Sequence, residues 1–507
     1  MVKYLSIKGG DIMRYKHIFW DFNGTIIDDV HNALSCVNDM LERKGMKPIN
    51  LSEYYDYVDT PIINFYYRIL PPEEVDFSEI SKQYHSDYAR HLEETTLAIG
   101  AEELLKELKE NGVHQYIITS NFIDETVDLV RKFGVNQYFD EILGADNTLA
   151  ESKIQRAKDF FDLKGINRND AIFIGDTLHD LETANALGID CVLVAYGHQG
   201  RKLLEEHNAY TVADLKDVRD IIFDKRIVDF HTHSTCSDGT MTPTELVNHA
   251  KESGLSAFAL TDHDSVDGIK EAQKRSEEIG MEFIPGIEFS AAENTETHII
   301  GLFIDPKNET LLKTIEKLKG SRKRRMEEVC SKLRDLGFDI THNEALAIAG
   351  GKFVGRAHIA KLMVEKGYCE TVRECFDKYI GLGKPAYAEK NELSAVEAVK
   401  SIRAAGGLAY LAHLNQTGYN IEQLEKLLLQ LKEAGLNGIE GYYPEYTPEN
   451  IAEYRALAER LSFSLSGGSD FHGGMKPHIS MGTGKGDLRI PYYVLDNMKG
   501  ILNRNCL

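Results

Sequence analysis

Two series of strand-like apolar runs, each alternating with helical sequence, constrain the fold of this 507-residue chain most strongly. The first series includes YKHIFWDF, HQYIITSN and AIFIGDT and ends at about Val194. Such alternation is typical of βαβ units and predicts an α/β fold with a Rossmann-like parallel sheet. Residues 29–97 are rich in helix formers and tyrosines and are too long for a plain crossover, so we expect a helical cap there.

The second series begins at RIVDFHTH and continues through SAFALTDHD, EFIPGIEFS, THIIGLF, GLAYLAHL, NGIEGYY and SFSLSGGSD. A series of this length predicts a closed α/β barrel. Residues 306–385 interrupt it with sequence rich in lysine and arginine, which we interpret as a helical insertion over the barrel mouth. We therefore predict one domain at 15–222 and a second at 225–507, in keeping with the length of the chain.

Composition excludes several classes of protein. The formal net charge of -22 argues against binding to duplex DNA, because an acidic body repels the phosphate backbone. No apolar run approaches the ~20 residues of a membrane-spanning helix. The first residues lack the features of a secretory signal, and the seven cysteines form no CxxC pair. We expect a cytoplasmic protein without membrane contact or thiolate metal site; the sequence does not indicate its oligomeric state.

Strands of the second series end in imidazole and carboxylate side chains. His231 and His233 stand two residues apart, so the period of a strand places both on the same side. Barrels of this class build their sites at the carboxyl ends of strands. A single histidine there is more simply a hydrogen-bonded core residue, but the whole set favours metal ligation. The set comprises His231, His233, Asp238, His263, Glu288, His298, His413, Asp470 and His472.

Mixed nitrogen and oxygen ligands without thiolate suit Mn, Zn or Fe, and nine ligands can serve two or three ions. Clustered ions of this kind activate water and neutralise a phosphate during its hydrolysis. The second half therefore predicts a metal-dependent phosphoesterase.

The motifs HTHSTCSDG, TDHD, GIEFS, GRAHIA, AHL and GGSDFHG resemble the PHP (polymerase and histidinol phosphatase) superfamily from about Arg226 onward. GRAHIA and GKPAY are most similar to the branch acting on nucleoside 3′,5′-bisphosphates and short 5′-phosphorylated oligoribonucleotides. The resemblance implies three ion sites: His231, His233, Glu288 and Asp470; Asp238, His263 and His472; and Glu288 as a bridge with His298 and His413.

The resemblance also implies that Arg356 in GRAHIA and Lys384 in GKPAY hold phosphate. A guanidinium fork matches phosphate oxygens, and an ammonium adds a point charge. The alternative for both is a solvated basic loop. Ala357 stands where the branch commonly has proline, which bears on the rigidity of the loop.

A second constellation lies in the first half. Asp21 ends the first apolar run, Thr119 and Ser120 end another, Lys153 begins a helix, and Asp176 with Asp180 follows IFIG. Covalent phosphotransfer requires a carboxylate nucleophile, a hydroxyl and a lysine that bind phosphate, and acidic residues that hold Mg²⁺.

These residues resemble the haloacid dehalogenase superfamily over about Lys16 to Gly197, with a cap of the phosphoglycolate-phosphatase kind. The resemblance implies that Asp21 is the nucleophile, Asp176 a Mg²⁺ ligand and Lys153 the partner of the aspartyl-phosphate. Thr119 is the phosphate hydroxyl, with Ser120 as the alternative. The usual general acid/base two residues after the nucleophile is replaced by Asn23, whose amide cannot transfer that proton.

Three hypotheses follow. The first is a metal-dependent phosphoesterase for nucleotide-type esters, joined to a phosphatase domain whose activity Asn23 leaves open. Its partner is a small phosphorylated metabolite or nucleotide, with short RNA as an alternative. The second is histidinol-phosphate or other small-molecule hydrolysis, against which the GRAHIA insertion argues. The third is a metal-stabilised nucleotide-binding or regulatory module, which would not require nine ligands.

Overall fold

The computed structural model describes residues 14–59, 62–145, 153–291, 296–349, 354–388 and 393–505. They form two compact units. Unit 1 comprises the chain up to residue 225 together with 447–464, and unit 2 comprises 226–446 and the residues from 465 onward. None of the helices in the described ranges is long and apolar enough to span a membrane.

A six-stranded parallel sheet organises unit 1, in the order β5-β4-β1-β6-β7-β8. Its strands are β1 (His17–Trp20), β4 (His114–Phe122), β5 (Glu141–Ala145), β6 (Ala171–Gly175), β7 (Asp190–Val194) and β8 (Thr211–Val212). From β1 the chain builds the sheet in one direction through β4 and β5 and in the other through β6, β7 and β8. The carboxyl ends of β1, β4 and β6 therefore lie at the point where the strand order reverses, which is where such folds bind ligands.

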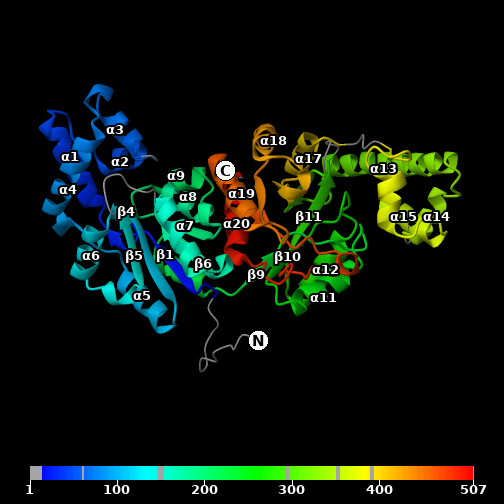
Figure 1. The fold of residues 1–507 in the computed structure, drawn as a ribbon, viewed down its shortest axis with the longest axis horizontal. Helices are drawn as coiled ribbons and strands as arrows, with labels where there is room; N and C mark the ends of the chain where they lie inside the picture. The colour runs from blue at the N-terminus through cyan, green and yellow to red at the C-terminus, as the bar shows by residue number, and fades with distance from the viewer. Residues whose placement is uncertain are drawn as a thin grey trace. The chain divides into compact units, whose positions relative to one another are not determined.

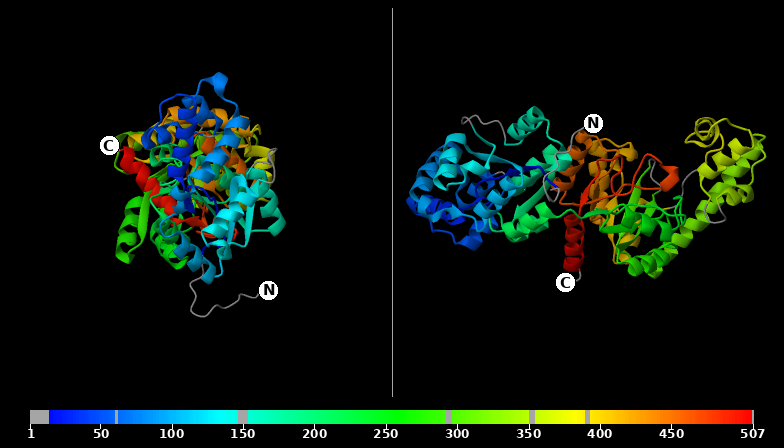
Figure 2. Two further views of the ribbon diagram at one scale, coloured as in Figure 1. Left: turned by 90° about the vertical axis from the view of Figure 1, so that its left-hand side faces the viewer. Right: turned by 90° about the horizontal axis from the view of Figure 1, so that it is seen from below.

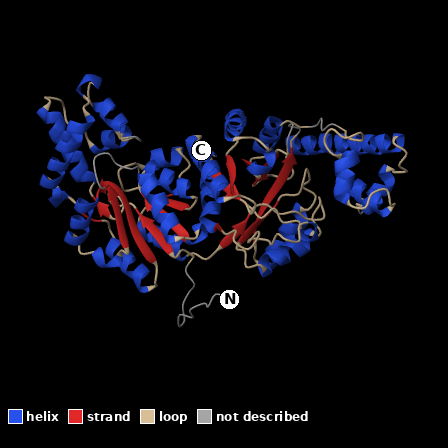
Figure 3. Cartoon of the chain, in the orientation of Figure 1, coloured by secondary structure: helices blue, strands red, loops and turns tan. Residues whose placement is uncertain are grey.

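Helices cover both faces of this sheet (Figures 1 and 3). Successive residues of β1 point to opposite faces: Ile18 and Trp20 pack in one core and Phe19 in the other. The first core includes residues of α5 (Ala101–Glu110), α6 (Ile123–Lys132) and α10 (Leu215–Phe223). The second includes residues of α7 (Lys153–Lys164) and α8 (Leu178–Leu187). Short α9 (Arg201–Glu206) precedes β8.

Four helices follow the first strand and form a cap with its own apolar core. They are α1 (Val30–Arg43), α2 (Leu51–Tyr57), α3 (Ile63–Ile69) and α4 (Phe77–Arg90). An antiparallel pair, β2 (Ile27–Asp28) and β3 (Thr96–Leu97), joins the cap to the sheet domain. Unit 1 also contains α19 (Pro448–Arg460), whose buried Arg455 donates a hydrogen bond to the carbonyl oxygen of Ile189.

An eight-stranded sheet organises unit 2, in the order β15-β14-β13-β12-β11-β10-β9-β16. Its strands are β9 (Ile227–Asp229), β10 (Ala257–Leu260), β11 (Glu282–Ser290), β12 (His298–Leu302), β13 (Leu408–Leu411), β14 (Gly438–Tyr442), β15 (Ser464–Gly467) and β16 (Ile490–Pro491). The predicted α/β architecture is confirmed in both halves.

The second sheet is mixed, with both parallel and antiparallel strand pairs. Strand β12 pairs antiparallel with both of its neighbours, β11 and β13. Backbone hydrogen bonds bring the chain after β15 to the chain after β9: Phe230 N donates to Gly467 O, and His233 N donates to Phe471 O. These bonds curve the sheet towards a barrel.

Helices α11 (Pro243–Glu252), α12 (Ile269–Ile279), α17 (Ala395–Ala404), α18 (Ile421–Glu433) and α20 (Tyr492–Asn505) complete the barrel region. The insertion consists of α13 (Glu309–Asp335), α14 (His342–Ile348), α15 (Arg356–Glu365) and α16 (Val372–Cys375) around a separate apolar core. Figures 1 and 2 show α13 leading away from the barrel strands into this helical group.

Candidate active sites

The side chain of Glu288 lies at the centre of the nine predicted metal ligands. Its Oε2 atom lies 3.2 Å from His231 Nε2, 3.2 Å from His233 Nε2 and 3.0 Å from His263 Nδ1. Its Oε1 atom lies 2.8 Å from His298 Nδ1 and 3.1 Å from His413 Nε2. One carboxylate therefore faces imidazoles from several strand ends, and each of its two oxygen atoms contacts different histidines.

Two aspartates complete the cluster. Asp470 Oδ1 lies 3.5 Å from both His231 Nε2 and His233 Nε2 and 3.3 Å from His472 Nδ1. Asp238 lies 3.3 Å from His472 Nε2 and 3.7 Å from His263 Nε2. All nine residues thus meet in one place. Three overlapping groups have ligand atoms close enough for a shared ion: His233, Asp238, His263 and His472; His231, His233 and Glu288; and His263, Glu288 and His298.

Several polar atoms in this cluster are buried without a hydrogen-bond partner among the described residues. They are His231 Nε2, His233 Nε2, His263 Nδ1, His413 Nδ1, Asp238 Oδ1 and Glu288 Oε2. An unsatisfied buried polar group is costly, at about 1 to 3 kcal/mol each. Since these atoms belong to residue types that ligate Mn, Zn and Fe, the arrangement fits divalent ions.

Electrostatics leads to the same conclusion. Burial alone would raise the pKa of Glu288, but His263 and His231 hold the pKa of this carboxyl well below its usual range. Burial lowers the pKa of His263 to about 3, whereas Asp470 and Glu288 outweigh burial and raise the pKa of His233 to about 9. Protonated imidazoles and bound cations are alternative ways to neutralise these carboxylates, so metal binding would release protons.

Backbone strain accompanies the cluster. Asp470 and His413 have positive φ angles of 57° and 25°, a region that residues other than glycine seldom adopt. Next to Asp470, a Cβ atom on Gly468 would lie 2.5 Å from the backbone nitrogen of His231. The turn after β15 therefore requires glycine in order to bring Asp470 beside His231.

Glu440 was missed by sequence reasoning. It is fully buried on β14; its Oε1 lies 2.9 Å from His231 Nδ1, and its Oε2 accepts a hydrogen bond from His413 N at 2.7 Å. Such a partner fixes the orientation and tautomer of a ligating imidazole. The sequence feature that could have revealed Glu440 is a carboxylate within the apolar run NGIEGYY. Lys476 was also missed: its Nζ lies 2.5 Å from Asp470 Oδ2.

Arg356 and Lys384 lie in the insertion and make none of these contacts. Arg356 begins α15, and its guanidinium lies 5.6 Å from the ring centre of Phe376, 5.9 Å from that of Tyr387 and 3.9 Å from Glu296. Lys384 is exposed. Their predicted phosphate contacts remain predictions.

The predicted residues of the N-terminal site also come together, at the carboxyl ends of β1 and β6. Lys153 Nζ donates to Asp21 Oδ1 and, at 2.6 Å, to Asp180 Oδ1. Asp176 accepts hydrogen bonds from Thr25 Oγ1 at 3.1 Å and from the backbone nitrogen of His198 at 2.6 Å. Asp21, Asp176 and Asp180 form a group close enough to share an ion.

Charge at this site is partly balanced by the chain itself. Burial tends to raise the pKa of Asp180, but Lys153 outweighs it and holds that pKa below its usual value. Burial raises the pKa of Asp176 to about 7 and that of Asp21 well above its usual range. A Mg²⁺ ion beside Asp21 and Asp176 would favour their ionised forms, so this acidic group fits that ion.

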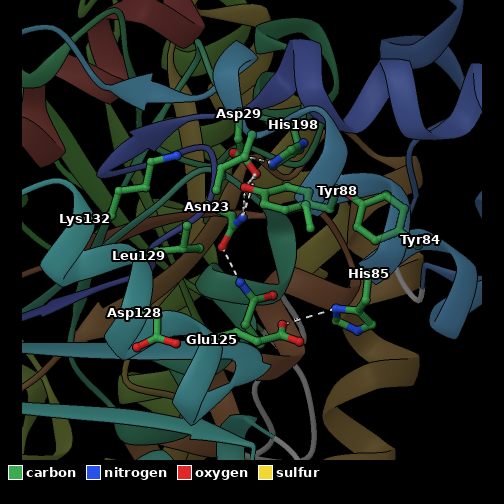
Figure 4. Close-up of a pocket in the computed structure, with 13 residues that line it drawn as sticks. Asn23, Asp29, Tyr84, His85, Tyr88, Glu125, Asp128, Leu129, Lys132 and His198 are labelled. Carbon is green, nitrogen blue, oxygen red and sulfur yellow. Dashed lines mark hydrogen bonds and ion pairs between the residues drawn. The ribbon is translucent and has the colours of Figure 1, made fainter.

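Thr119 and Asn23 are the other two predicted residues of this site. Thr119 is buried within β4, which extends to Phe122 past the predicted end, whereas its alternative Ser120 is exposed. Asn23 is fixed at both ends of its amide. Its Nδ2 donates to Asp29 Oδ2 at 2.6 Å, and Figure 4 shows these two side chains together; its Oδ1 accepts from Asn121 Nδ2 at 2.6 Å.

Asp29 was missed by sequence reasoning because it stands at the start of the cap. Its fully buried carboxylate also accepts hydrogen bonds from Tyr88 OH at 2.8 Å and Gly24 N at 2.8 Å, and lies 3.1 Å from His198 Nε2. Burial would raise the pKa of Asp29, but His198 and Asn23 hold it below its usual value. Asn23 is therefore the neutral partner of a buried carboxylate.

Comparison with known proteins gives two matches along the chain. Residues 18–194 match the haloacid dehalogenase-like hydrolase family, and residues 229–471 match the PHP domain family. A phosphoglycolate phosphatase of Pseudomonas fluorescens is 28% identical over 209 residues, which span 39% of this chain and 76% of that protein.

Relatives of the second half are more similar. A 5′-3′ exoribonuclease of Haemophilus influenzae is 35% identical over 248 residues, or 48% of this chain and 89% of that protein. A 3′,5′-nucleoside bisphosphate phosphatase of Chromobacterium violaceum is 32% identical over 247 residues, or 48% of this chain and 87% of that protein. Both resemblances seen in the sequence are confirmed. The chain belongs to the PHP family and joins its PHP domain to an N-terminal haloacid dehalogenase-like hydrolase domain.

Proposed function

We propose that unit 2 is a metal-dependent phosphoesterase that hydrolyses nucleotide-type esters, namely nucleoside 3′,5′-bisphosphates or short 5′-phosphorylated oligoribonucleotides. The observation that carries this proposal is the convergence of nine imidazole and carboxylate side chains around Glu288. Two of its relatives are named as a 3′,5′-nucleoside bisphosphate phosphatase and a 5′-3′ exoribonuclease, which supports these substrate classes.

Two or three Mn, Zn or Fe ions held by these residues would activate a water molecule for attack on phosphorus and neutralise the phosphate. The chain's own residues orient that chemistry. Glu440 fixes the ring of His231, while Lys476 and Tyr443 hold Asp470 through its Oδ2 atom at 2.5 and 3.0 Å. We assign the binding of substrate phosphate to Arg356 and Lys384, whose positive charges oppose that of the ester.

Arg356 supports the nucleotide class over a simple sugar or histidinol phosphate. Its guanidinium lies near the rings of Phe376 and Tyr387, so the cation that we assign to phosphate would have aromatic side chains beside it. Aromatic faces stack on nucleobases, with a contribution of about 1 to 3 kcal/mol per base. A domain that binds metal ions only for its stability would not require a cation beside aromatic rings.

A phosphate-release screen of the full chain with Mn²⁺ tests the proposal, using nucleoside 3′,5′-bisphosphates, a 5′-phosphorylated trinucleotide and histidinol phosphate. We expect turnover of the first two classes to be lost in His233→Ala and retained in His478→Ala, which changes an exposed histidine of the same unit. Preferred turnover of histidinol phosphate would instead support the second hypothesis.

A second function is favoured by the contacts of Lys153, which joins Asp21 to Asp180 in a buried site beside Asp176. We propose that unit 1 is a Mg²⁺-dependent phosphatase with Asp21 as nucleophile, Thr119 as phosphate hydroxyl and Lys153 neutralising the phosphate. The test is hydrolysis of acetyl phosphate, whose leaving group needs no proton, by the full chain and by Asp21→Asn. Equal rates in the two proteins would exclude Asp21 as nucleophile.

A further inference from the structure

A cavity of about 400 Å³ opens beside Asn23 in unit 1. Figure 4 shows side chains of the cap helix α4 on one side and of α6 on the other. Helix α4 contributes Tyr84, Tyr88 and Ala89, and α6 contributes Glu125, Leu129 and Lys132. A cavity of this volume holds a substrate much larger than a two-carbon acid.

One wall of the cavity is aromatic. The rings of Tyr84 and Tyr88 lie 6.0 Å apart between centroids, and the neighbouring ring of His85 lies 5.4 Å from that of Phe122. Leu129 adds an apolar side chain from α6. Flat aromatic groups pack favourably against such rings.

Charged groups follow the opposite wall. Glu125 and Asp128 carry carboxylates three residues apart on α6, and Lys132 follows one turn later, so all three share one face of the helix. Glu125 lies 3.2 Å from His85 across the cavity. Carboxylates next to one lysine match a ligand that carries an ammonium together with a carboxylate, and they disfavour a ligand with anionic groups alone.

Asn23, which lines the cavity, restricts the kind of leaving group that the substrate can have. Asn23 cannot donate the proton that an alkoxide needs, because a side-chain amide is not acidic; its hydrogen bonds to Asp29 and Asn121 fix its orientation. A phenol, with an ordinary pKa of about 10, can leave as its anion. The aromatic wall and the absent acid therefore indicate the same kind of substrate.

We propose that the N-terminal site hydrolyses aryl phosphate monoesters that carry an amino group, for which free phosphotyrosine is the matching probe. This inference rests on the proposed phosphatase function of unit 1. Asp21 attacks phosphorus, the bond from phosphorus to the aryl oxygen breaks, and the aryl oxide leaves with the electron pair and takes a proton from solvent. Water then cleaves the aspartyl-phosphate, which restores the carboxylate and releases inorganic phosphate.

The test uses the full chain with His233→Ala, so that the C-terminal site does not contribute. Phosphotyrosine, N-acetyl phosphotyrosine, phosphoserine, phosphoglycolate and acetyl phosphate are compared. We expect kcat/KM for phosphotyrosine to exceed that for phosphoserine and phosphoglycolate by about 10² or more, the scale of the missing general acid. N-acetylation should raise KM, because it removes the ammonium.

Ala89 offers a steric test, since it lines the cavity from an exposed position on α4. Ala89→Trp should lower kcat/KM for phosphotyrosine about tenfold or more, because an indole at this position would narrow the cavity, and should lower kcat/KM for the much smaller acetyl phosphate by less. Ser86→Trp, also at an exposed position on α4, is the matched control and should change neither rate. Glu125→Gln should raise KM for phosphotyrosine but not for its N-acetyl form.

Two outcomes would overturn the inference in distinguishable ways. Hydrolysis of acetyl phosphate without preference for phosphotyrosine, or a preference that Ala89→Trp leaves intact, would refute the substrate class alone. Absence of any turnover that depends on Asp21, including that of acetyl phosphate, would contradict the phosphatase function, and the substrate class with it.

Discussion

The two candidate sites of this chain balance their buried charge differently. In unit 1 the chain supplies a cation, because Lys153 contacts both Asp21 and Asp180. In unit 2 Lys476 contacts Asp470, whereas the buried carboxylate of Glu288 faces histidines, and atoms such as His231 Nε2 and Glu288 Oε2 have no hydrogen-bond partner in the described ranges. The comparison indicates that unit 2 depends far more on bound ions for its local structure than unit 1 does.

Removing the ligands of unit 2 should have the largest effect. We expect two or three Mn, Fe or Zn ions per purified chain, and fewer than one in His233→Ala with Asp470→Ala. Bisphosphatase activity should fall by at least about 10⁴-fold, the scale of losing a catalytic group outright. Elemental analysis decides the metal content. One ion or fewer in the folded parent chain after metal supplementation would remove the trinuclear assignment.

Asn23→Asp should have the next largest effect, confined to unit 1. The new carboxyl would stand where Asn23 Nδ2 now lies 2.6 Å from Asp29 Oδ2, so the two carboxyls would share a proton. That proton is available to a leaving alkoxide, and we expect hydrolysis of alkyl phosphates to rise by up to ~10² to 10⁴-fold. Steady-state kinetics with phosphoserine measures the gain.

Asp29→Asn provides the control for that experiment. In the double variant Asn23→Asp with Asp29→Asn the shared proton is removed, so the gain should shrink at neutral pH. An unchanged rate in Asn23→Asp, with Asp21 still reactive towards acetyl phosphate, would mean that another group supplies the proton.

Arg356→Ala tests the proposed contact between unit 2 and the substrate phosphate. Loss of one charge-assisted hydrogen bond, about 1.5 to 3 kcal/mol, should lower kcat/KM for bisphosphates by roughly 10- to 100-fold while the metal content stays constant. Arg373→Ala, which changes an arginine of the insertion that is 92% exposed, is the matched control. Equal kinetics in the two variants would return Arg356 to the solvated-loop interpretation.

Glu459 on α19 should give the smallest effect, on stability alone. Burial raises its pKa to about 7, although Asn185 donates a hydrogen bond to it at 2.7 Å. Because the folded state prefers the neutral carboxyl, its stabilising contribution is complete below the usual pKa of 4.5 and is lost as the pH rises to about 7. Glu459→Gln should therefore stabilise unit 1 at pH 8 by about 1 to 3 kcal/mol and change little at pH 4. Thermal unfolding at both pH values measures this, and equal shifts at both would exclude titration of Glu459.

Much of both sites could be predicted because the chemistry is local in the sequence. Asp21 directly follows β1 and His231 comes two residues after the end of β9, and parallel strands bring their carboxyl ends to one edge. Glu440 and Asp29 could not be predicted in this way. Glu440 acts through His231 and Asp29 through His198, and each partner lies far away along the chain. A single acidic residue in the sequence does not indicate such a partner.

The sequence by itself determined the two α/β domains, the kinds of side chain at each site and the replacement of the usual acid by Asn23. Those properties depend on the periodicity of apolar residues and on the chemistry of single side chains. Tertiary structure decided that β12 runs antiparallel, that Glu288 faces five imidazoles, and that Asn23 is held by Asp29 and Asn121 beside an aromatic cavity. These features depend on which distant segments of the chain pack together. Two polar side chains attract each other only weakly in water, but the same pair interacts strongly once packing has buried it.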